Sequence, residues 1–282
     1  MTQALDSLHS GKAPNFGIII IGDEILSGKR ADKHLSKFIE LLSVRGLSLA
    51  YANYVGDSPD RIVATLTQAF ASADVVFSCG GIGATPDDHT RQCAAKALQR
   101  ELMLHPEAES LIRERMQEMA REQGKAFEPE RADNVHRYNM GMFPAGARII
   151  PNPYNKIPGF SCEGDFGGAV HFVPGFPVMA WPMMEWVLDT AYSKWFKKAG
   201  KTEKSVIVFG AMESTLTPMM IDIESRFDGI KVFSLPSVDH PQYGRHIELG
   251  VKGTSSQLDD AYRTLMSGLR DIGASIGPEL VR

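Results

Sequence analysis

A concentration of glycine and aspartate makes residues 80–90, GGIGATPDDHT, the part of this chain best suited to chemistry. They come directly after residues 74–79, a largely apolar run that reads as a buried strand. Glycines at a strand end leave backbone N–H groups uncovered, and a helix beginning near Pro86 would add free N–H groups and the positive end of its dipole. Such a corner suits an anion, most often a phosphate. Asp87 and Asp88 would repel a phosphate unless a divalent cation or a proton intervenes, so these residues predict a phosphate-and-metal site.

The alternative interpretation of residues 80–90, which we call the glycine loop, is structural. Glycines also form tight turns, and aspartate commonly caps the helix that follows it. Short glycine patterns often occur without a function, so the rest of the chain has to decide between the two interpretations.

The composition is that of a soluble globular protein, with 282 residues, 43% hydrophobic and 23% charged, and a net charge of −4. Basic residues are scattered among acidic ones, so we expect no nucleic-acid partner. The aliphatic run 18–21 is far too short to span a bilayer, and we expect no membrane association. Residues 1–15 are polar and lack a signal-peptide pattern, which indicates a disordered lead-in. The 3 cysteines form no CxxC pair, so a reducing cytoplasm is expected.

The order of predicted elements indicates a parallel sheet. Residues 16–22 are apolar enough for a central strand covered on both faces, and an amphipathic helix is expected over 32–45. A strand over 47–55 and a helix over 60–71 lead to the strand at 74–79. This order predicts right-handed crossovers, with ligands at the carboxyl ends of the strands. Further helices are expected over 86–100, 106–123, 130–140 and 178–198, strands over 147–152 and 169–173, and irregular structure over 151–160.

A second domain is expected after a boundary near residue 200. Strand 205–209, helix 215–226, strands 231–235 and 246–251, and helix 256–272 follow in that order. This βαββα pattern is the size of a small α+β domain. The predicted organisation is therefore a lead-in over 1–15, an α/β domain over 16–198 and a small α+β domain over 202–282.

Several motifs occur in the order seen in one family. These are residues 22–28 (GDEILSG), 55–57 (VGD), the glycine loop, 152–153 (NP), 158–160 (PGF), 174–177 (PGFP) and 213–214 (ES). Over roughly residues 16–275 the chain resembles the competence/damage-inducible protein A (CinA) family, whose first domain has the molybdopterin-binding MoaB/Mog-type fold. The resemblance implies a three-layer α/β/α domain with a mostly parallel sheet, followed by a small α+β domain. Many members carry a further amidohydrolase domain acting on nicotinamide mononucleotide, for which we expect no room before Arg282.

The resemblance also implies roles for individual residues. Asp57 matches an acidic position facing the glycine loop, so Asp57 and Asp88 are expected to hold Mg²⁺ or a similar cation. Asp57 as the cap of helix 60–71 remains an open alternative. Glu24 is a candidate metal ligand or general base, and Asp23 could bond a pterin or sugar edge. The remaining candidate contacts to the phosphate or its attached group are Gly22, Gly80, Gly81, Gly83, Thr85, Asp87, Thr90, Asn152, Gly159, Pro174 and Gly175.

Three functions are compatible with these residues. The first is metal-dependent hydrolysis of an ADP-ribose-like pyrophosphate, with Asp57, Asp88 and Glu24 as the catalytic candidates. The second is nucleotidyl transfer in molybdenum-cofactor assembly. The third is a non-catalytic module that binds molybdopterin or a nucleotide. In each case the partner is a phosphorylated small molecule, and because the family commonly dimerises, a homodimer is expected.

Overall fold

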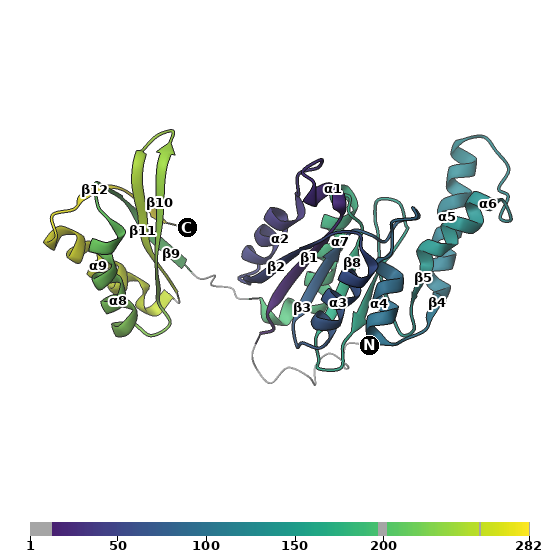
Figure 1. Ribbon diagram of the computed structural model, residues 1–282, viewed down its shortest axis with the longest axis horizontal. Coiled ribbons are helices and arrows are strands. Elements are labelled where there is room, and N and C mark those ends of the chain that lie inside the picture. The colour runs from purple at the N-terminus through teal and green to yellow at the C-terminus, as the bar shows by residue number, and fades with distance from the viewer. Residues whose placement is uncertain (1–12, 197–201, 254, 282) are drawn as a thin grey trace. The chain divides into compact units, whose positions relative to one another are not determined.

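The structure, a computed structural model, describes residues 13–196, 202–253 and 255–281, and the chain divides into two compact units, 1–196 and 197–282 (Figure 1). Most of the expected lead-in over 1–15 lies outside the described residues. Asn15 is described, and its carbonyl accepts a 2.9 Å hydrogen bond from the Val75 N–H. The expected boundary near residue 200 also lies outside them. Each unit has its own sheet and its own core.

The sheet of the first unit is mostly parallel, as its sequence predicts. Its strands are β1 (Phe16–Ile21), β2 (Leu49–Val55), β3 (Val75–Cys79), β6 (Arg148–Ile150), β7 (Gly159–Glu163) and β8 (Ala169–Val173). They lie in the order β2-β1-β3-β8-β7-β6. The first four pair in parallel, while β7 runs antiparallel to both β8 and β6. The carboxyl ends of β2, β1, β3 and β8 therefore meet at one edge.

Helices cover both faces of this sheet (Figure 1). They are α1 (Asp23–Leu26), α2 (His34–Ser43), α3 (Pro59–Phe70), α4 (Thr90–Leu98) and α7 (Pro177–Ala191), followed by the short η2 (Ser193–Trp195). One core lies between the sheet and α2 with α7, and the other between the sheet and α3 with α4, which explains why every residue of β1 is buried. The predicted three-layer fold is confirmed. No helix within the described ranges is long and apolar enough to cross a membrane.

Helix α4 begins at Thr90, so the expectation of a helix from Pro86 is wrong. Asp88 N–H donates to the Thr85 carbonyl at 3.0 Å, and the Thr85 N–H donates back to the Asp88 carboxylate at 2.8 Å. Pro86 lies second in this four-residue turn, a position that its fixed φ favours as strongly as the first turn of a helix. The non-helical part of the glycine loop therefore extends to His89, and the positive end of the α4 dipole lies at Thr90 instead of near Pro86.

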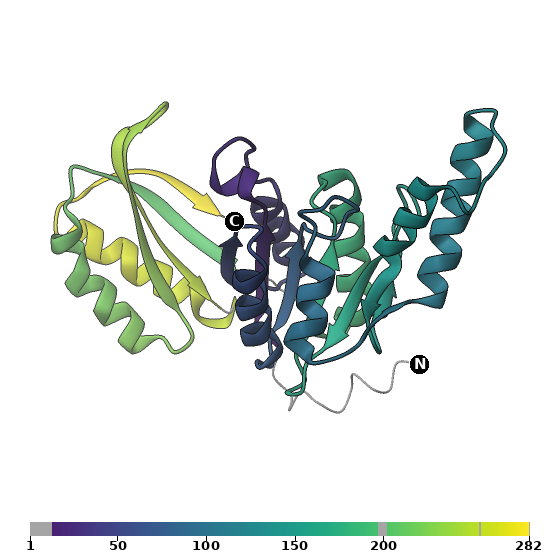
Figure 2. The same cartoon turned by 45° about the vertical axis from the view of Figure 1, so that its right-hand side comes forward.

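Residues 99–147 form an arm that extends beyond the sheet (Figure 2). The arm consists of β4 (Leu102–Leu104), α5 (Pro106–Glu122), α6 (Ala132–Tyr138), η1 (Asn139–Gly141) and β5 (Met142–Pro144), with β4 and β5 paired antiparallel. Phe143 stacks on Phe160 with ring centroids 4.5 Å apart, and Phe160 stacks on Phe172 at 4.3 Å. These rings join the base of the arm to the sheet.

The second unit is a βαββαβ domain. It comprises β9 (Thr202–Phe209), α8 (Glu213–Arg226), β10 (Lys231–His240), β11 (Gly244–Gly253), α9 (Ser255–Asp271) and β12 (Ser275–Val281). Its antiparallel sheet has the order β10-β11-β9-β12, and both helices contribute to one core. The α+β class is confirmed, but the expected βαββα pattern lacks β12. Other departures lie in the first unit, where α1, β4 and β5 were not expected and β7 begins inside the segment expected to be irregular.

Candidate functional site

A cavity of about 410 Å³ opens where β1, β3 and β8 end. Most of the residues singled out from the sequence line it, namely Gly22, Glu24, Asp57, Gly80, Gly81, Gly83, Thr85, Asp87, Asp88, Asn152, Pro174 and Gly175. Asp23, Thr90 and Gly159 do not line it. Strand ends and loops that lie more than a hundred residues apart in the sequence thus line the same cavity.

The glycine loop turns back on itself and leaves some of its N–H groups uncovered. Gly80 and Gly81 have φ angles of 105° and 67°, in the region that favours glycine. Thr90 is fully buried and closes the loop from inside. Its Oγ1 donates a hydrogen bond to the Gly80 carbonyl at 3.1 Å, and its N–H donates one to the Gly81 carbonyl at 3.0 Å. The N–H groups of residues 82–84 donate no hydrogen bond to any part of the chain that the structure describes. They remain available to an anion.

Asp88 braces this loop. Its Oδ2 accepts hydrogen bonds from the Thr85 N–H at 2.8 Å and the Thr85 Oγ1 at 2.6 Å. Behind the loop, Arg91 is 3% exposed and donates to the Ile82 carbonyl. Burial lowers the pKa of Arg91 to about 10, partly offset by the charge of Asp88, so the guanidinium keeps its charge at neutral pH. A positive charge therefore lies behind the uncovered N–H groups.

Four carboxylates lie close enough to interact electrostatically: those of Asp23, Glu24, Asp57 and Asp87. We call them the acidic cluster. The Asp23 N–H donates to Asp57 Oδ2 at 2.9 Å, and the Asp57 N–H donates to Asp23 Oδ1 at 3.2 Å. Burial raises the pKa of Asp57, and the negative charges of the other three carboxylates add to this rise, against the effect of the Asp23 N–H. A bound cation would relieve this repulsion.

A metal site is not completed by side chains alone. No group of three or more His, Cys, Asp and Glu side chains within residues 13–196, 202–253 and 255–281 could hold a metal ion. The divalent cation expected at Asp57 and Asp88 therefore stays a prediction. Any ion there would need oxygen ligands from a bound molecule or from water.

Asn152 and Gly159 shape the wall of the cavity from within the fold. Asn152 is 4% exposed, and its amide donates to Asn155 Oδ1 at 2.8 Å and to the Ile157 carbonyl at 2.9 Å while accepting the Tyr154 N–H at 3.0 Å. These bonds satisfy most of its hydrogen-bonding capacity. At Gly159, on β7, a Cβ would collide with the backbone of β8. Both residues hold the chain in place.

Part of the cavity lining was not predicted from the sequence. These residues are Ile21, Arg30, Ile82, Ala84, Met140, Asn155, Ile157, Pro158, Phe176 and Met179. Phe176 belongs to the PGFP motif, of which only the first two residues were taken as ligand contacts. Arg30 lies 3.5 Å from Glu24 and 5.6 Å from the centre of the Phe176 ring. No local pattern pointed to Arg30 or to Met140, which reaches the cavity from the arm.

His34 supports the corner that carries Phe176. It is 5% exposed, and its Nε2 forms a 3.0 Å hydrogen bond with the Gly175 carbonyl. Asp32 fixes the start of α2 by accepting the N–H of His34 at 2.8 Å and that of Leu35 at 3.1 Å. Helix α2 and the β8–α7 corner are thereby tied together beneath the apolar part of the cavity.

Comparison with known proteins agrees with this geometry. Residues 17–194 match the family described as a probable molybdopterin binding domain. A protein from Caldivirga maquilingensis is 30% identical over 266 residues, which is 90% of this chain and 96% of the relative. A CinA-like protein from Mycobacterium tuberculosis is 30% identical over 225 residues, 78% of this chain and 51% of the relative.

A solved structure shares the fold of the first unit. The crystal structure of the protein CinA, of unknown function, from Thermoplasma acidophilum is 26% identical with a TM-score of 0.53, covering 64% of this chain and 98% of that chain. The chain spans nearly the full length of the Caldivirga relative but about half the length of the CinA-like protein from Mycobacterium tuberculosis. The chain therefore belongs to the probable molybdopterin binding domain family, and it is similar to CinA-like proteins.

Proposed function

We propose that the cavity binds a phosphorylated nucleotide or pterin and hydrolyses a pyrophosphate bond in it with the help of a divalent cation. The observation that carries this proposal is that the cavity is lined by two unlike kinds of group. Uncovered N–H groups and the carboxylates of Glu24, Asp57 and Asp87 provide polar surface, and Ile157, Phe176 and Met179 provide apolar surface. A cavity of about 410 Å³ suits a small molecule that has a charged end and a ring.

The anionic end of the ligand would lie on the glycine loop. The N–H groups of residues 82–84 can each donate to a phosphate oxygen, and Arg91 behind them adds a fixed positive charge. Because these donors are already in place, they can also stabilise the negative charge that develops during hydrolysis. The family description of a probable molybdopterin binding domain supports a ligand of this chemistry.

The carboxylate oxygens available in the cavity are too few to bind a hard cation by themselves, so a phosphate of the ligand would have to supply further oxygens. Asp57 and Asp88 each keep one oxygen that bonds no residue in the described part of the chain. Mg²⁺ commonly takes one or two carboxylates and completes its shell with phosphate oxygens and water. When bound, such a cation would neutralise the phosphates and lower the pKa of an attacking water.

In the proposed reaction, the oxygen of water bonds to one phosphorus and the bond from that phosphorus to the bridging oxygen breaks. Two phosphomonoesters leave, and Glu24 accepts the proton that the water loses. Arg30, which also lines the cavity, lies 3.5 Å from Glu24.

The test is release of inorganic phosphate after a coupled phosphatase has acted on the products formed from ADP-ribose or FAD, with and without Mg²⁺. Turnover that requires the cation and falls at least a hundredfold in Asp57→Asn supports the proposal. Binding of ADP-ribose by calorimetry without any turnover would instead indicate a non-catalytic module. Adenylyl transfer from Mg-ATP to molybdopterin, without cleavage of ADP-ribose, would indicate the nucleotidyl transferase.

We also propose that the protein is a cytoplasmic homodimer. Val178 and Trp186, on α7, are 54% and 43% exposed and offer apolar surface for a second copy. Light scattering after size exclusion should give the mass of two chains, and cell fractionation should find the protein in the cytoplasm. A monomer for both the wild type and Trp186→Lys would contradict the dimer.

A further inference from the structure

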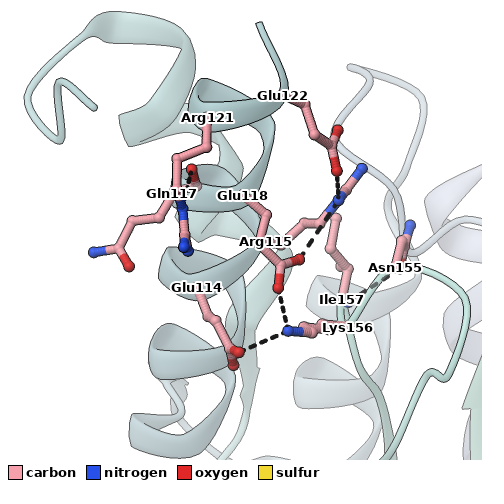
Figure 3. A network of polar contacts seen from close by, with 9 residues as sticks. All are labelled: Glu114, Arg115, Gln117, Glu118, Arg121, Glu122, Asn155, Lys156 and Ile157. Carbon is pink, nitrogen blue, oxygen red and sulfur yellow. Dashed lines mark hydrogen bonds and ion pairs between the residues drawn. The ribbon is translucent and has the colours of Figure 1, made fainter. Parts of the chain in front are cut away.

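One lysine connects the wall of the cavity to the arm. Lys156 Nζ lies 2.6 Å from Glu114 Oε1 and also bonds Glu118 Oε1, and both glutamates belong to α5 (Figure 3). Arg115 lies 3.5 Å from Glu118 and 3.0 Å from Glu122. Charges of alternating sign therefore continue from Lys156 along one side of α5.

The position of Lys156 in the chain makes this contact relevant to the cavity. It lies in the wall segment, residues 151–158, between Asn155 and Ile157, which both line the cavity. Its φ of 65° is in the left-handed region, which costs energy for a residue other than glycine. The turn that directs the Lys156 side chain to α5 is thus the same turn that presents its two neighbours to the cavity.

A second part of the arm, η1, also reaches the cavity. Met140, in η1, lines the cavity directly. Ala108 and Ile112 are fully buried at the base of α5, whereas Glu114 and Glu118 lie farther along the helix. Met116, the last buried residue of α5, lies between the two glutamates, so the ion pairs of Lys156 fasten α5 to the wall segment at the end of its buried part.

We propose that Lys156 is a positioning residue whose ion pairs with Glu114 and Glu118 hold the wall segment against the arm and so set the shape of the cavity. Through this contact, the position of the arm influences how tightly the cavity binds its ligand. The statement about ligand affinity rests on the proposed function, but the statement about the wall segment does not.

The expected effect is moderate because the groups are partly exposed. The side chains of Lys156 and Glu118 are 36% and 29% exposed, and ion pairs in such positions contribute little individually. Hydrogen bonds from Lys156 lower the pKa of Glu118, which keeps that carboxylate charged at neutral pH. Loss of both pairs should change a measured equilibrium by roughly threefold to tenfold.

The first test is amide hydrogen exchange in the wall segment of the protein without ligand. Lys156→Met and the double variant Glu114→Gln with Glu118→Gln should each speed exchange at residues 154–157 by roughly threefold to tenfold. Lys156→Arg, which keeps the charge, should restore slow exchange. The control is Arg113→Met, which removes an α5 ion pair with Glu109 that does not touch the wall segment. Unchanged exchange in Lys156→Met would overturn the proposal.

The second test measures ADP-ribose binding by calorimetry in the same variants. Lys156→Met should weaken binding by a similar factor, and high salt should weaken binding to the wild type more than to this variant. Equal affinities of wild type and Lys156→Met would refute the coupling. If the wild type does not bind ADP-ribose, the proposed function fails for this ligand, and the exchange experiment alone decides the role of Lys156.

Discussion

Asp23 and Asp57 are bound to each other through a pair of hydrogen bonds in which each backbone N–H donates to the other's carboxylate, at 2.9 and 3.2 Å. This exchange joins the end of β1 to the end of β2 at the edge of the cavity. It also places two negative charges side by side, which is unfavourable without a cation or a proton between them. The arrangement is therefore suited to binding a cation, and it lowers the stability of the protein without one.

Replacing Asp57 by Asn should raise the Tm of the protein without ligand at pH 7. The raised native pKa of Asp57 means that its ionised form opposes folding, and Asn removes this charge while keeping an oxygen for the Asp23 N–H. The advantage should shrink as the pH falls below the raised native pKa, and it should vanish below the ordinary pKa of an aspartate, where wild-type Asp57 is protonated in both states. Asp88→Ala should instead lower the Tm, since it removes the acceptor of two hydrogen bonds from Thr85. A lower Tm for Asp57→Asn at pH 7 would contradict this account.

Alanine at Gly80 or Gly81 should destabilise the first unit by about 1–3 kcal/mol or more. Both glycines have positive φ, and a Cβ would meet the Ile21 carbonyl at Gly80 and the Thr90 Oγ1 at Gly81. Gly175→Ala is the matched control, because its Cβ would find only Gly80 Cα at 3.6 Å. Urea unfolding should place this control within about 0.5 kcal/mol of the wild type. Equal stabilities for all three variants would show that the loop can move to accommodate a Cβ at Gly80 or Gly81, which would contradict the prediction.

Acid should weaken the protein through His171. This buried imidazole bonds Ser161 Oγ and the Tyr192 hydroxyl, each at 2.7 Å, and burial lowers its pKa to about 3. The unfolded chain binds this proton near pH 6.5, so stability should fall by up to about 1.4 kcal/mol per pH unit between 6.5 and 3. His171→Phe should flatten this part of the pH profile measured by urea unfolding, while His136→Gln, at an exposed position, should not. An unchanged profile in His171→Phe would refute the assignment.

The three cysteines should be inert in the native protein. Cys79, Cys93 and Cys162 are at most 3% exposed, and burial raises the pKa of each thiol, that of Cys162 to about 12. Thiolate is the reactive form, so Ellman's reagent should react fully only after denaturant is added. Fast reaction of even one thiol at pH 8 without denaturant would show that part of the core opens readily.

Most of the first sheet could be predicted because most of its strands are short runs rich in apolar residues, each followed directly by glycine or proline. The strand β12 could not, since Gly277 and Pro278 lie in its centre and read as a loop. The register of β12 against β9 shifts between Ile276 and Glu279, and proline is tolerated at such an irregular edge strand. The helix start at Pro86 was predicted wrongly for a related reason, because proline is favoured both in turns and in the first turn of a helix.

The site was predictable where it depends on strand ends and unpredictable where it depends on distant contacts. Gly80 and Asp57 follow strands, so topology brings them together. Thr90 was expected to contact a phosphate, but it lies inside the loop, and only its buried hydrogen bond to Gly80 reveals this. Met140 lies on an arm whose direction no local pattern indicates.

The stack of Phe143, Phe160 and Phe172 bears on how this domain can change through evolution. Phe160 and Phe172 are fully buried, and Phe143, which comes from the arm, covers part of their surface. A relative without the arm would expose that apolar surface unless a smaller or polar residue replaced Phe160. The length of the segment between α4 and β6 and the side chain at position 160 should therefore vary together among relatives.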